Sequence, residues 1–132
     1  MSINPEKADA RAAARAARQA KRATKEAEED KKLRIATGVV KRLMKELAYT
    51  HKEIETQQAK IAKCAADPDY DQSRLPQQEA VLHESKMMVP EVTAKLNAAV
   101  AALAALLADE AFVANVTKGL EDAQALVASV TS

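Results

Sequence analysis

The sequence is poor in the residues that build turns, sheets and aromatic cores. Its 132 residues include two glycines, four prolines, one cysteine and no tryptophan, and aromatic residues make up 2% of the chain. Strands favour β-branched and aromatic residues and are joined by turns that favour glycine, so a mainly β fold is excluded. Because Cys64 is the only cysteine, no intrachain disulfide can form, which fits a reducing compartment.

The residues that mark catalytic and metal sites are also missing. His51 and His83 are isolated from other ligand-type side chains, and Gly38 and Gly119 are single glycines rather than a phosphate-binding loop. We therefore expect no catalytic residue, no cofactor and no metal. No apolar run approaches the ~20 residues of a membrane span, and the N-terminus lacks the apolar region of a secretory signal. These features favour a cytoplasmic protein with no membrane partner.

Strong helix formers dominate the remaining composition, and their apolar members recur at helical spacing. Three apolar stripes alternate steps of three and four residues, as in coiled coils. The first runs from residue 33 to Pro68, which ends it, the second from 75 to 106 and the third from 113 to 130. The first stripe consists of Leu33, Ala36, Val40, Leu43, Leu47, Thr50, Ile54, Gln57, Ile61 and Cys64.

The stripes predict an all-α fold, an up-down-up three-helix bundle with coiled-coil-like packing over residues 31–132. The helices are expected at about 31–66, 72–108 and 111–130, the first two long and the third shorter, with Asp109 capping the third. Folding the chain at Pro68 places Val40 opposite Ala99 in an antiparallel hairpin. Since the third helix is short, the hairpin near Pro68 should be a thin two-helix arm with a polar seam of Gln57, Gln78 and Ser85.

Residues 1–30 form a basic Ala/Arg-rich extension that differs from the rest of the chain. Residues 1–25 hold seven basic and two acidic residues, a net charge of +5. Arg11, Arg15, Arg18 and Arg22 recur at helical spacing, with alanine around them and no apolar face to bury. We expect a helical or disordered segment that the bundle does not need for stability. Its charge either attracts an acidic partner or forms a solvated tail with no binding role.

Two segments resemble the helix signatures of the tubulin-binding cofactor A family. The segment Ile35–Glu46, IATGVVKRLMKE, resembles the signature of the family's first helix, and Glu84–Pro90, ESKMMVP, that of its second. Tyr70 and the pair Gln57-Gln58 between them also fit, so the resemblance covers roughly residues 33–108. It implies a three-helix bundle that uses no nucleotide or metal and captures β-tubulin released from the cytosolic chaperonin.

The resemblance implies a tubulin-folding cofactor that works without catalysis, in the cytoplasm and associated with the cytoskeleton. The partner-binding residues we expect are those of the two signatures that face away from the seam: Lys41, Arg42, Lys45, Glu84, Lys86 and Met87. β-Tubulin is the expected partner, with no nucleic acid and a monomeric state favoured. The alternative is a generic coiled-coil adaptor or scaffold of the cytoskeleton or of membrane traffic, and identifying what the chain captures from cytosol separates the two.

Overall fold

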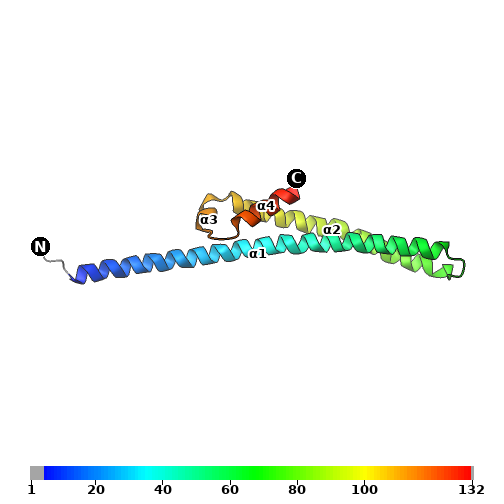
Figure 1. Ribbon diagram of the computed structural model, residues 1–132, viewed down its shortest axis with the longest axis horizontal. Helices are drawn as coiled ribbons and strands as arrows, with labels where there is room; N and C mark the ends of the chain where they lie inside the picture. Colours follow the sequence, from blue (N-terminus) through cyan, green and yellow to red (C-terminus); the bar gives the residue numbers. More distant parts are fainter. Residues whose placement is uncertain (1–4, 132) are drawn as a thin grey trace. The chain divides into compact units, whose positions relative to one another are not determined.

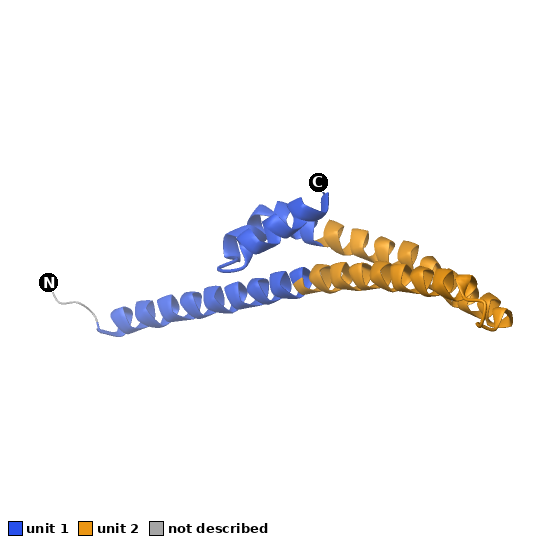
Figure 2. Ribbon diagram, turned by 45° about the vertical axis from the view of Figure 1, so that its right-hand side comes forward, with its two compact units in different colours: residues 1–37, 103–132 blue, residues 38–102 orange. Residues whose placement is uncertain are grey.

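The computed structural model describes residues 5–131, and the helices account for nearly all of them. In chain order these are α1 (Pro5–Ala66), the 3-10 helix η1 (Gln72–Arg74), α2 (Leu75–Ala108), α3 (Glu110–Asn115) and α4 (Leu120–Thr131) (Figure 1). No strand occurs among the described residues, so the predicted all-α class is confirmed. Residues 1–4 of the expected extension lie outside the described residues. Two compact units divide the chain: unit 1 comprises residues 1–37 and 103–132, and unit 2 comprises residues 38–102 (Figure 2).

Unit 2 is an antiparallel hairpin of α1 and α2 (Figure 2). The first helix ends at Ala66, where Pro68 was predicted to stop it. Side chains fix the loop that follows, since Gln72 Nε2 donates to the carbonyl oxygens of Cys64 at 3.2 Å and Asp67 at 3.3 Å. The Asp71 carboxylate accepts a hydrogen bond from Ser73 N at 3.1 Å and caps η1. The turn therefore satisfies part of its own polar backbone.

The core of unit 2 is concentrated in one half of the hairpin. Its buried residues are Val40, Leu43 and Thr50 on α1 and Ser85, Val92, Leu96 and Val100 on α2. The Thr50 hydroxyl donates to the Glu46 carbonyl at 2.9 Å, which satisfies its polar group inside the seam. From residue 51 to residue 84 every side chain is exposed or half-buried. The predicted thin arm is therefore present, because two helices alone bury only the seam between them.

The predicted single helix over residues 111–130 is wrong. The segment contains two helices, α3 and α4, separated by Val116 to Gly119. Val116 has extended backbone angles, and Gly119 has φ +87°, in the left-handed region that a helix interior never adopts. The predicted cap is confirmed, because the Asp109 carboxylate accepts hydrogen bonds from Ala111 N at 3.0 Å and Phe112 N at 3.2 Å. The described chain thus has four α-helices instead of three.

The break between α3 and α4 is fixed to α1 within unit 1. The Asp30 carboxylate accepts a hydrogen bond from Thr117 N at 2.7 Å and a second, short one from the Thr117 hydroxyl. A Cβ placed on Gly119 would lie 3.7 Å from Leu33 Cδ2, so this backbone runs close to the α1 side chain. The unit's buried apolar side chains are Leu33, Leu103, Phe112 and Ala123.

The basic extension is helical from Pro5 onward and continues into the packed part of α1 without a break at residue 30. Residues 5–25 are exposed throughout. In an isolated helix, forming the first hydrogen-bonded turn costs free energy. Here the packed part of α1 already supplies that turn, so the helix only has to propagate toward the N-terminus. Alanine and arginine are among the best helix formers, so propagation without burial is reasonable.

The helix α2 is more apolar than predicted. The stretch Gln72–Ala108 includes an 18-residue window that is long and apolar enough to cross a membrane, by length and composition alone. The expectation that no such stretch exists overlooked alanine, which dominates this part of α2. The helix buries Val92, Leu96 and Val100 along one side. Only 22% of the apolar window is buried, so packing accounts for one side of the helix and leaves most of the window unburied.

Candidate partner-binding surface

All six residues predicted to bind a partner are exposed on the hairpin of unit 2. Lys41, Arg42 and Lys45 lie on α1, and Glu84, Lys86 and Met87 lie on α2. Met87 is 59% exposed, although it is an apolar side chain. The prediction that these side chains point away from the seam is confirmed, and their role in binding remains a prediction.

The six residues form two groups at different heights along the hairpin. The α1 group lies 21 to 25 residues before the end of the helix at Ala66, which is about 31–38 Å at 1.5 Å per residue. The α2 group lies 9 to 12 residues after the start of the helix at Leu75, which is about 14–18 Å from the same loop. A partner that touches both groups must therefore follow the hairpin over about 13–24 Å.

The two groups do not share one face either. A helix turns by about 100° per residue, so Lys41 and Arg42 project to opposite sides of the seam, and Lys45 projects away from it. On α2, Glu84 and Lys86 likewise project to opposite sides. A compact six-residue patch is thus not what the structure presents, and any contact through all six must wrap around the hairpin.

Three exposed apolar residues were missed by the sequence analysis as members of this surface. Tyr49 on α1 is 70% exposed, and Val81 and Met88 on α2 are 47% and 46% exposed. Their positions relative to the seam put them on the side that also carries Arg42 and Glu84. The available signal was an aromatic residue at an outer position of a chain with only two tyrosines and one phenylalanine. Exposed aromatic and methionine side chains are enriched where proteins bind one another.

A hollow of about 240 Å³ lies between the two helices of the arm. Its walls are Gln57, Lys60 and Ile61 from α1 and Gln77, Gln78 and Val81 from α2. The amide oxygens of Gln57 and Gln78 are buried without a hydrogen-bond partner, while Gln78 Nε2 donates to the Tyr70 hydroxyl at 2.5 Å. The polar seam predicted here is therefore present, and it packs less completely than the apolar half.

Two carboxyl groups with a lowered pKa lie at turns of the chain. Hydrogen bonds from Ser73 and the positive charge of Arg74 lower the pKa of Asp71. Hydrogen bonds from Thr117 lower the pKa of Asp30. Within residues 5–131 no group of three or more His, Cys, Asp or Glu side chains is placed to hold a metal ion. Shifted carboxylates here have structural partners that account for them.

An antiparallel helical hairpin with exposed charged and apolar side chains on its outer faces belongs to the class of helical protein-binding scaffolds. A sequence model of the family described as "Tubulin binding cofactor A" matches residues 28–127. The chain belongs to this family. The match begins inside α1, after most of the basic extension, and ends at residue 127, within α4.

Curated relatives agree with the family match. The chain is 37% identical over 94 residues to the human protein "Tubulin-specific chaperone A", covering 71% of this chain and 80% of the relative. It is 44% identical over 82 residues to "Tubulin-folding cofactor A" of Arabidopsis thaliana, covering 60% of this chain and 69% of the relative.

Solved structures have the same fold. The crystal structure of tubulin folding cofactor A from Arabidopsis thaliana has a TM-score of 0.65 and 38% identity, covering 79% of this chain and 96% of that chain. Tubulin-binding cofactor A from Leishmania major has a TM-score of 0.55 and 28% identity, covering 79% of this chain and 97% of that chain. The helical hairpin is therefore shared with family members from distant organisms.

Proposed function

We propose that this chain is a tubulin-folding cofactor that captures β-tubulin in the cytoplasm and holds it for later assembly, without catalysing a reaction. Two observations support the proposal. The family match covers residues 28–127, and relatives that are 37% and 44% identical over the aligned residues bear the names of a tubulin chaperone and a tubulin-folding cofactor. A stoichiometric holder needs an extended surface rather than an enclosed site, and the hairpin has such a surface.

The observation that carries the proposal is that part of each signature segment is exposed. Lys41, Lys45 and Met87 lie in stretches that resemble the family's helix signatures, yet each of them is exposed. Core packing therefore does not require lysine or methionine at these positions. We assign them, with Arg42, Glu84 and Lys86, to the contact with β-tubulin.

The exposed apolar side chains extend the same surface. Tyr49 lies between the two charged groups along the hairpin, and Met88 follows Met87 directly. An apolar centre flanked by charged residues is the usual composition of a protein interface. In this arrangement Tyr49 and Met87 supply buried contact area, and the lysines supply attraction and orientation.

A charge-reversal pair tests the assignment. We expect Lys41→Glu with Lys45→Glu to weaken β-tubulin capture at least tenfold, because two attractive contacts become repulsive. The thermal midpoint should remain unchanged, since both side chains are exposed. Lys60→Glu with Lys63→Glu is the matched control, with the same charge change on the same helix near the loop, and should bind normally. Equal binding by both double variants would clear Lys41 and Lys45 of the role.

A further inference from the structure

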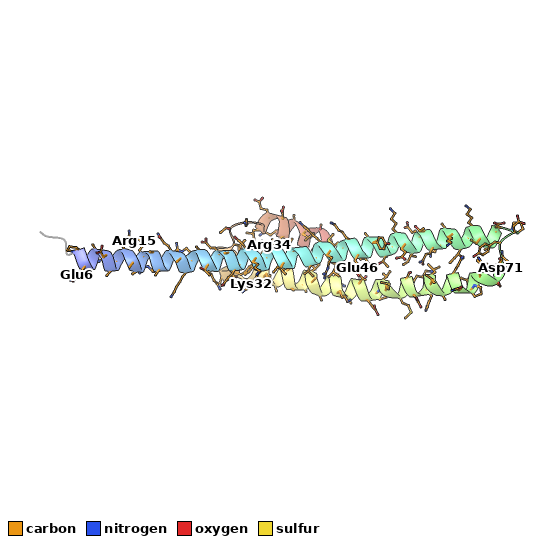
Figure 3. All side chains as sticks on the ribbon, turned by 90° about the horizontal axis from the view of Figure 1, so that it is seen from below. Glu6, Arg15, Lys32, Arg34, Glu46 and Asp71 are labelled. Carbon is orange, nitrogen blue, oxygen red and sulfur yellow. The ribbon has the colours of Figure 1, made fainter. Side chains whose placement is uncertain are left out.

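We propose that Arg11, Arg15, Arg18 and Arg22 form a binding surface for a carboxylate-rich peptide segment. We call these four residues the arginine stripe. Their spacing of four, three and four residues places them on one side of α1, over about 17 Å of helix. All four are exposed, and within residues 5–131 none of them forms an ion pair or a hydrogen bond through its side chain. Figure 3 shows Arg15 on a part of α1 with no other helix of unit 1 beside it.

The arginine stripe continues the face of α1 that is buried further along the helix. Steps of three and four residues lead from the buried Leu33 back to Glu29, then to the half-buried Glu26 and to Arg22. The side chain of Leu33 is 1% exposed and that of Glu29 is 4% exposed, whereas every residue from 5 to 25 is exposed. The arginine stripe is thus the exposed end of a face of α1 that is buried further along the helix, at Glu29 and Leu33.

Glu29 shows how a carboxylate is held on this face. Lys25 Nζ lies 3.5 Å from Glu29 Oε1, and Lys32 Nζ lies 3.4 Å from the same atom. A carboxylate at a seam position is therefore flanked by basic side chains from the turns before and after it. In the turns from Arg11 to Arg22 the basic side chains recur, but the sequence contains no carboxylate. A partner that supplies carboxylates along the stripe would repeat the arrangement around Glu29.

The chemistry of the surrounding residues favours a peptide over other polyanions. Residues 5–28 include no Val, Leu, Ile, Met or aromatic residue, so this helix has no apolar face to insert into a membrane. Base stacking of single-stranded nucleic acid requires aromatic side chains, which are absent as well. Arginine pairs with carboxylates in bidentate geometry, and successive arginines about 5 Å apart match the side chains of an extended acidic segment.

The inference does not depend on the tubulin proposal. The arginine stripe lies N-terminal to the family match, which begins at residue 28. Its charge is also separate from the tubulin-binding surface proposed on unit 2. Failure of either proposal therefore leaves the other standing.

Fluorescence anisotropy with the full chain and a labelled peptide of about ten glutamates tests the inference, since five extended residues already span the stripe. We expect salt-sensitive binding that weakens at least tenfold between about 0.1 M and about 1 M salt, where the Debye length falls from ~10 Å to ~3 Å. Replacing all four arginines by glutamine should weaken binding at least tenfold. Replacing them by lysine should retain only part of it, because the charge remains but the bidentate pairing is lost.

The matched control removes four positive charges elsewhere, through Lys52→Gln, Lys60→Gln, Lys63→Gln and Lys95→Gln, and should bind the peptide within twofold of the natural chain. Circular dichroism checks that α1 stays helical, since glutamine and arginine have similar helix propensities. The inference is overturned if the natural chain does not bind the peptide, or if the arginine variant binds normally. It is also overturned if the control loses as much, or if an RNA oligonucleotide or anionic vesicles bind the stripe more tightly than the peptide does.

Discussion

Replacing Leu43 by alanine should cost the hairpin far more stability than the same replacement at Leu82. Leu43 is 5% exposed in the apolar half of unit 2, whereas Leu82 is half-buried in the arm. Each replacement removes three carbon atoms, worth about 0.8 kcal/mol apiece when fully buried, or about 2.4 kcal/mol. A residual cavity of about 50 Å³ adds about 1.2 kcal/mol at 24 cal/mol per Å³. We therefore expect a loss of about 3.5 kcal/mol for Leu43→Ala.

Leu82→Ala should cost about 1–1.5 kcal/mol, because the side chain already contacts water and the cavity can fill with solvent. Urea unfolding followed by far-ultraviolet circular dichroism measures both free energies of unfolding. Thermal unfolding should show a drop in midpoint of roughly 10 °C or more for Leu43→Ala. Equal costs at the two positions, or a cost below 1 kcal/mol at Leu43, would refute the view that the core is concentrated in one half of the hairpin.

Three further predictions concern the arm and the break between α3 and α4. Backbone amides near Gln57 and Gln78 should exchange hydrogen faster than those near Leu43, and uniform protection along α1 and α2 would contradict a thin arm. Asp30→Asn should destabilise the chain at neutral pH but not in strong acid. Hydrogen bonds from Thr117 lower the folded-state pKa of Asp30, so its stabilisation is complete above the ordinary pKa of aspartate and is lost as the pH falls through the lowered pKa. A pH-independent effect of the substitution in urea titrations would argue against this role. Gly119→Ala should cost about 1–2 kcal/mol, measured by thermal unfolding, because φ is +87° there, and an unchanged midpoint would show that the turn relaxes.

The sequence predicted the two long helices well because their signals are strong and local. The a and d positions of the first stripe are all buried or half-buried in the structure, and α1 and α2 end at Ala66 and Ala108 as expected. Pro68 cannot continue a helix, and Asp109 can cap one, so both boundaries follow from the chemistry of single residues.

The break between α3 and α4 could not be predicted from periodicity. Apolar residues from Val113 to Val130 keep helical spacing across the break, so the pattern indicates a single helix. The break is held by Asp30, which accepts a hydrogen bond from Thr117 N although the two residues lie 87 positions apart in the sequence. A contact between such distant residues leaves no pattern in the sequence around Thr117. Gly119 was the one local indication, because glycine alone adopts its backbone angle without strain.

The candidate surface could be predicted only in part. Exposure of Lys41, Arg42, Lys45, Glu84, Lys86 and Met87 follows from their positions relative to the apolar stripes, and the structure has all six exposed. Their division into two groups follows from the helix rise once the hairpin is known. Tyr49, Val81 and Met88 were missed, because a periodic pattern separates buried from exposed positions but does not show which exposed positions contact a partner.

The most direct test of the central claim is sedimentation of the purified chain with purified β-tubulin and, separately, with the intact tubulin heterodimer. We expect a discrete complex of the chain with β-tubulin, abolished or strongly weakened by Lys41→Glu with Lys45→Glu and retained by Lys60→Glu with Lys63→Glu. Crosslinks from that complex should fall on the outer faces of α1 and α2. The claim would be contradicted if the chain formed no complex with β-tubulin. It would also be contradicted if both charge-reversal variants formed the complex equally well and the crosslinks fell elsewhere.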